Sequence, residues 1–164
     1  MKYPTFLLTV AILITSLAAS ANSQTAVEAS MDEYRKGRAY LEAKDYPRAI
    51  EHLNRSIAIK PSSGAYMDLG LSYSRSKKHQ DAIVAFKQVA RTVPNNPQVH
   101  YWLSWSYLSL ATEVAMATKS KDLTLLGNAE AEAREAIRLQ PVYPGAYYIL
   151  GDVLYIEGKH VEAV

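Results

Sequence analysis

The side chains best suited to catalysis or metal binding do not form a site in this sequence. The four histidines, at positions 52, 79, 100 and 160, are never four residues apart, and none has an acidic neighbour at a metal-binding spacing. The seven glycines form no Gly-rich phosphate loop, and no serine lies in a nucleophile elbow. We therefore expect no enzyme, no catalytic residue, no bound metal and no cofactor.

The charged residues also point away from several classes of partner. The sequence has 18 basic and 16 acidic residues, and 17 of the basic ones follow position 21. This balance gives no electrostatic reason to expect nucleic acid or an anionic membrane surface as the partner. One acidic cluster, Glu130, Glu132 and Glu135, shares a helical pattern with Ala129 and Ala133. We expect the alanines to be buried and the glutamates to face solvent.

A repeated order of small and large residues organises the chain after position 30. Three pairs of landmarks are each separated by 33 residues: Gly37 and Gly70, Ala49 and Ala82, and Pro61 and Pro94. Each unit reads as two amphipathic helices joined by a turn, and neither helix can bury its apolar face alone. A period of this length is typical of a helical solenoid.

These landmarks resemble the tetratricopeptide repeat family. Its pattern has Trp, Leu-Gly and Tyr on the first helix, and Ala, Phe, Ala and Pro on and after the second. The unit that fits best carries Leu69, Gly70, Tyr73, Ala82, Phe86 and Pro94. The Trp position is filled instead by Glu33, Tyr66, His100 and Tyr147. The resemblance covers residues 30–164 and implies an all-α, right-handed superhelical solenoid in which Gly37, Gly70 and Gly151 pack against Ala49, Ala82 and Ala163.

The landmarks divide the chain into segments. They are a signal peptide (1–21), a flexible leader (22–29), two repeat units (30–62 and 63–96), a third unit with an insertion (97–143) and a partial fourth (144–164). Apolar spacing predicts helices over 32–43, 46–59, 65–76, 79–92, 97–118, 123–139 and 144–156, and another from about 160. Asp45 and Asp122 are the expected N-caps.

The third unit is longer than the others between its two helices. Tyr107 precedes Ala129 by 22 residues, whereas Tyr73 precedes Ala82 by 9. No breaker interrupts the added residues, so we expect both helices to be lengthened, by about two turns each, with residues 119–122 at the exposed tip. The extension is either a knob that contacts a partner or a tolerated surface feature.

The first 21 residues differ from the rest. Lys2 is followed by an apolar run from Thr5 to Leu17 and by the small residues Ala19, Ser20 and Ala21. This order predicts a secretory signal peptide cleaved after Ala21, or alternatively after Ser23, and a periplasmic or secreted mature protein. The other interpretation is an uncleaved anchor, although the run is short for a membrane span of about 20 residues. The chain has no cysteine for a disulfide or for lipid attachment.

In the family, the first helices of successive units line a concave groove that binds peptides. On this chain the resemblance places an aromatic and apolar lining there, with two arginines: Tyr34, Arg38, Met67, Leu71, Arg75, Tyr101, Trp105, Leu108, Tyr148 and Tyr155. Aromatic residues and arginine dominate binding hot spots. Lys and Asn, which hold a C-terminal carboxylate in some family members, are replaced here by Tyr34 and Arg38.

Two hypotheses of function follow besides an enzyme. The first is an exported, non-catalytic scaffold that binds a protein or peptide in the groove. The second is a self-associating structural module, or the N-terminal repeat part of a longer protein. An enzyme, the third hypothesis, would need a catalytic domain beyond Val164. Ala163 lies inside the second helix of unit four, and no sealing helix follows it. We therefore expect Leu150 and Leu154 to be partly uncovered, either through a truncated reading frame or awaiting a partner.

Overall fold

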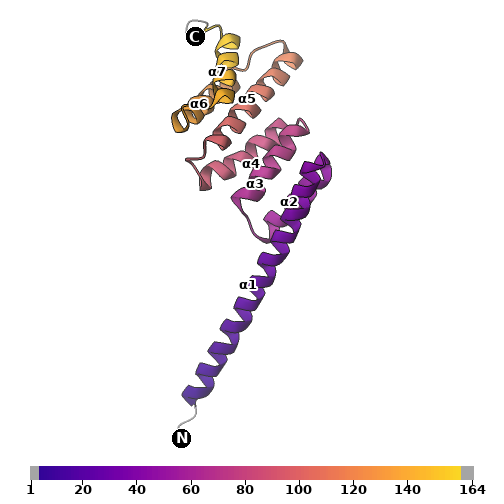
Figure 1. Ribbon diagram of the computed structural model, residues 1–164, viewed down its shortest axis with the longest axis vertical. Helices are drawn as coiled ribbons and strands as arrows, with labels where there is room; N and C mark the ends of the chain where they lie inside the picture. The colour runs from indigo at the N-terminus through magenta and orange to yellow at the C-terminus, as the bar shows by residue number, and fades with distance from the viewer. Residues whose placement is uncertain (1–3, 160–164) are drawn as a thin grey trace.

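The computed structural model describes the backbone of residues 4–159 and the side chains of residues 23–159. Within this part the chain forms helices and no strand, and Figure 1 shows the helices stacked as successive antiparallel pairs. The helices are α1 (Pro4–Glu42), α2 (Tyr46–Ile59), α3 (Ser63–Arg75), α4 (His79–Thr92), α5 (Pro97–Thr118), α6 (Leu123–Leu139) and α7 (Pro144–Glu157). The all-α solenoid is therefore confirmed, while the helix predicted from residue 160 lies outside the described residues.

The helix ends follow from capping residues. The Asp45 carboxylate accepts from the Arg48 N–H, and the Asp122 carboxylate accepts from the N–H groups of Thr124 and Leu125, as predicted. Prolines fall in the first turns of α2, α5 and α7, where a missing N–H costs no hydrogen bond. These signals fix the boundaries of the helices along the solenoid.

Close helix packing explains the repeated glycines, although not through the expected partners. A Cβ on Gly37 would lie 2.7 Å from Leu53 Cγ, and one on Gly70 would lie 2.5 Å from Phe86 Cε1. The predicted partners Ala49 and Ala82 are therefore wrong as the closest contacts. Because large residues one turn further along each second helix fill the space over these glycines, only a hydrogen atom fits there.

Unit three has a serine where the first two units have glycine. Ser104 is fully buried, and its hydroxyl donates to the Ala129 carbonyl of α6 at 2.8 Å. A buried hydroxyl needs a partner, and this carbonyl supplies it. The serine thus replaces close backbone contact with a hydrogen bond between α5 and α6.

The extension of unit three is helical on both sides of its turn, as predicted: it lengthens α5 and α6. Its tip, however, is not wholly free, because the Lys121 ammonium donates to the Ile156 carbonyl near the end of α7. Leu110, Leu125 and Ile156 pack against one core cluster together. The added turns of α5 and α6 therefore support α7.

Helix α1 begins much earlier than the predicted residue 32. It runs without interruption from Pro4, so the backbone of residues 22–29, expected to be a loose leader, is helical. No proline or glycine separates these residues from the first repeat, which is why the helix continues. In Figure 1 the N-terminal part of α1 extends away from the other helices.

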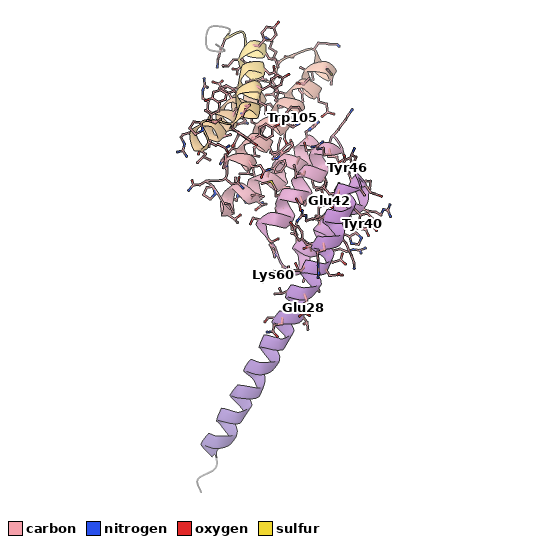
Figure 2. All side chains as sticks on the ribbon, in the orientation of Figure 1. Glu28, Tyr40, Glu42, Tyr46, Lys60 and Trp105 are labelled. Carbon is pink, nitrogen blue, oxygen red and sulfur yellow. The ribbon has the colours of Figure 1, made fainter. Side chains whose placement is uncertain are left out.

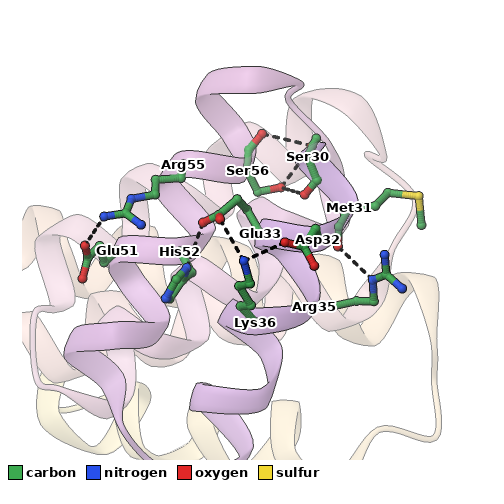
Figure 3. A network of polar contacts seen from close by, with 10 residues as sticks. All are labelled: Ser30, Met31, Asp32, Glu33, Arg35, Lys36, Glu51, His52, Arg55 and Ser56. Atoms are coloured by element: carbon green, nitrogen blue, oxygen red, sulfur yellow. Dashed lines mark hydrogen bonds and ion pairs between the residues drawn. The ribbon is translucent and has the colours of Figure 1, made fainter. Parts of the chain in front are cut away.

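The packed part of α1 is joined to α2 by a polar network (Figure 3). Ser56 Oγ donates to the Ser30 carbonyl at 2.9 Å, and Ser30 Oγ donates to the Ser56 carbonyl at 3.1 Å. One turn further, Glu33 pairs with His52 at 2.8 Å. Ser30 and Ser56 are both buried, so these hydrogen bonds satisfy polar atoms that would otherwise be costly inside the interface.

At the C-terminal end, one expectation is wrong and another is only partly confirmed. Glu130 is buried rather than solvated, because it pairs with Arg134 on its own helix and with Lys159 at 3.0 Å. Leu154 is only 1% exposed, so the expectation that it is partly uncovered is wrong, whereas Leu150 is half-buried, as expected.

Candidate functional site

The first helices of the units share a hollowed face. The larger hollow has a volume of about 850 Å³ and lies between α3, α5 and α7. A smaller one, of about 290 Å³, lies between the end of α1, α3 and the start of α5. Arg75 and Trp102 line both hollows, so the two are neighbours on one face. We call the two hollows together the groove.

The structure brings half of the predicted groove residues to the larger hollow. These residues are Arg75, Tyr101, Trp105, Leu108 and Tyr148. Leu108 is buried at the floor, whereas Trp105 and Tyr148 are 38% and 67% exposed. Figure 2 shows Trp105 on α5. Leu71 lines the smaller hollow. Large apolar surfaces are therefore open to solvent above a buried apolar floor.

The other predicted residues lie elsewhere. Met67 packs against the core, and Tyr34 is half-buried beside Asp68, where burial raises the pKa of its hydroxyl. Arg38 lies over the Tyr34 ring and pairs with Asp68 at 3.6 Å. Tyr155 is exposed but lines neither hollow. The first unit therefore uses its groove-facing residues for contacts within the molecule.

Several lining residues were not predicted from the sequence. Trp102 follows Tyr101 directly and was missed because only one face of α5 was assigned to the groove. The ring centroids of Trp102 and Tyr101 are 5.0 Å apart. The lining also includes Lys77, in the turn before α4, His79, the first residue of α4, and Glu113 and Met116 of α5. Glu113 and Met116 belong to the added turns of α5, so the extension forms part of the groove.

Two polar atoms in the groove wall are left without partners. Trp102 Nε1 and His79 Nδ1 are buried and have no hydrogen-bond partner among the described residues. Burial lowers the pKa of His79, which favours the neutral ring, while the carboxylate of Glu113 opposes this shift. A buried polar atom without a hydrogen-bond partner costs about 1–3 kcal/mol, so these two atoms lower the stability of the groove wall.

Charges are placed at opposite sides of the aromatic floor. Arg75 and Lys77 lie at the α3 side, and Asp152 lies on α7. No metal-binding group of three or more His, Cys, Asp or Glu residues occurs among the described side chains. The arrangement can therefore hold apolar side chains and complementary charges.

Comparison with protein families identifies the repeat. Tetratricopeptide repeat models match residues 18–64 and 125–164 in one case and residues 65–96 in another. The chain belongs to the tetratricopeptide repeat family. No curated protein matches its sequence. The matched residues include both helices of units one and two, in agreement with the 33-residue period.

Solved tetratricopeptide repeat structures share the fold at low sequence identity. The Arabidopsis OM64 domain is 17% identical with a TM-score of 0.66, over 78% of this chain and 96% of that one. MamA from Desulfovibrio magneticus is 18% identical with a TM-score of 0.71, over 82% and 69%. The second domain of human RPAP3, in complex with an HSP70 peptide, is 16% identical with a TM-score of 0.64, over 80% and 97%.

Proposed function

We propose that this protein is an exported, non-catalytic scaffold that binds a segment of another protein in the groove. The observation that carries the proposal is the exposed aromatic surface of Trp105 and Tyr148 above the buried floor of Leu108. Such residues lose much apolar surface to water when a partner covers them, and aromatic anchors in pockets dominate binding energy. The RPAP3 domain, which shares this fold, is in complex with a peptide.

A crosslinking pull-down from the envelope fraction of the native host tests this function. The tagged chain is compared with a Tyr101→Ala/Trp105→Ala variant of unchanged helicity. The matched control is Tyr155→Ala, which removes an exposed tyrosine outside the groove. We expect the double variant to lose its partner by about tenfold or more and the control to retain it. Equal recovery by all three proteins would contradict binding in the groove.

Export is the part of the proposal that rests on the N-terminal sequence pattern. The projection of the start of α1 away from the solenoid is compatible with removal of residues 1–21. In the part of the chain whose side chains are described, no helix is both long and apolar enough to cross a membrane. Fractionation of the native host, with mass determination of the isolated protein, should find a chain beginning at Asn22 outside the cytoplasm. A full-length cytoplasmic chain would contradict export.

Self-association is the second candidate function. Tyr147 and Tyr155 on α7 are 51% and 71% exposed and lie outside the groove. Light scattering over a range of concentrations distinguishes the two functions. Dimers that persist in the Trp105→Ala variant and dissociate in a Tyr147→Ala/Tyr155→Ala variant would favour self-association.

A further inference from the structure

The groove carries opposite charges on its two flanking helices. On the α3 side, the Arg75 guanidinium has no ion pair or hydrogen bond with any other described residue. On α7, the Asp152 carboxylate likewise lacks a partner within residues 23–159. Elsewhere on this face, Arg38 already pairs with Glu42 and with Asp68. These two charges are therefore available to a partner.

The other two charged residues of the larger hollow have opposite signs. Lys77, in the turn before α4, and Glu113, in the extension of α5, are both close enough to His79 to affect its pKa, in opposite directions. Their charges therefore oppose each other near His79. The net pattern across the groove, from α3 over α5 to α7, is cation, aromatic floor, anion.

We propose that the groove selects a peptide segment that carries an acidic residue at the α3 side, a large apolar residue over α5 and a basic residue at the α7 side. This inference rests on the proposed function and specifies the chemistry of the partner. Arg75 receives the acidic side chain, Trp105 and Tyr148 enclose the apolar one, and Asp152 receives the basic one. Because both signs are needed, a uniformly acidic tail is a poor ligand.

The spacing across the groove sets the length of the segment. Packed helices lie about 8–10 Å apart, so α3 and α7, on either side of α5, are separated by about 20 Å. An extended chain covers this distance in about six residues at roughly 3.3–3.6 Å each. The groove therefore fits an extended segment of about six residues.

The experiment uses the full chain and four fluorescent peptides with both ends blocked. Their sequences are Glu-Glu-Ser-Trp-Ser-Lys-Lys, an all-acidic form with Glu-Glu at both ends, an all-basic form with Lys-Lys at both ends, and a neutral form with Gln-Gln at both ends. Fluorescence anisotropy gives the dissociation constants. We expect the mixed peptide to bind about two- to fivefold more tightly than each of the other three, as exposed charge pairs contribute modestly.

Two charge-reversal variants test which groove residue binds which charged side chain of the peptide. Asp152→Lys should transfer the preference to the all-acidic peptide, and Arg75→Glu should transfer it to the all-basic peptide. Both side chains are on the surface of the groove, so unchanged helicity is expected. Peptides that bind with equal affinity regardless of charge, and that still depend on Trp105, would overturn the charge pattern while leaving the proposed function intact. Absence of binding by every peptide, or binding unaffected by Trp105→Ala, would overturn both.

Discussion

The packing of Gly70 against Phe86 gives a quantitative test of the helix pairing. Replacing Gly70 by alanine places a Cβ 2.5, 2.7 and 2.8 Å from three atoms of the Phe86 ring. Phe86 is fully buried, so its ring has no open space into which to move. Overpacking of this kind costs about 1–3 kcal/mol. Alanine also gains about 1 kcal/mol over glycine in a helix interior, which offsets part of that cost.

Gly127 provides the matched control. It lies within α6, and a Cβ there would meet nothing within 4 Å. Gly127→Ala should therefore show only the higher helix propensity of alanine and stabilise the protein by about 1 kcal/mol. Both variants gain the same helix propensity, but only Gly70→Ala overpacks the core. Their free energies of unfolding should therefore differ by the overpacking cost, about 1–3 kcal/mol.

Guanidinium denaturation followed by circular dichroism at 222 nm measures this difference. We expect Gly127→Ala to unfold at a higher midpoint than the unmodified protein and Gly70→Ala at a lower midpoint than Gly127→Ala. Equal stabilisation by both variants would refute close packing of α3 against α4 at Phe86. A large change in the slope of either transition would show that the variant altered the surface exposed on unfolding and not packing alone.

Three other predictions concern single interactions. His100 contacts two acceptors, the Glu132 carboxylate at 2.7 Å and the Pro94 carbonyl at 2.8 Å. Both ring nitrogens can donate only when the ring is protonated. The hydrogen bond to Glu132 accordingly raises the pKa of His100 above 6.5. The stability lost in His100→Gln should therefore be full below pH 6.5 and shrink as the pH rises through the raised pKa, and a pH-independent loss in chemical denaturation would argue against this. Ser104→Ala should cost about 1 kcal/mol in the same assay by removing the hydrogen bond between α5 and the Ala129 carbonyl, whereas an unchanged midpoint would mean that the bond contributes nothing. Asp122→Ala should cost about 1 kcal/mol by removing the N-cap of α6, with Asp122→Asn as the control that keeps an acceptor and most of the stability.

Much of the fold could be predicted because each repeat contains its own boundary signals. The bounds of α2, α4, α5 and α6 agree with the predicted ranges, since caps, prolines and apolar spacing all act within a few residues. The start of α1 was missed for the opposite reason. No local signal stops a helix before Ser30, and apolar spacing alone does not show where tertiary packing begins.

The groove was harder to predict because a repeat pattern assigns positions, not side-chain contacts. Arg38 and Leu71 occupy equivalent positions, yet Arg38 pairs with Asp68 while Leu71 lines the smaller hollow. The contribution of Glu113 and Met116 depends on how far the lengthened α5 extends past the turn before α4. Such differences between units arise from neighbouring side chains and insertions, which the repeated landmarks do not contain.

Site-specific photo-crosslinking tests binding in the groove most directly. A photoreactive phenylalanine analogue is placed at Thr112, which lines the larger hollow, or at Val84 on α4, which is 53% exposed and lines neither hollow. Irradiation in the native host should yield a partner adduct from position 112 and none from position 84. An adduct formed from position 84 and not from position 112 would contradict the proposal that the concave face is the binding surface.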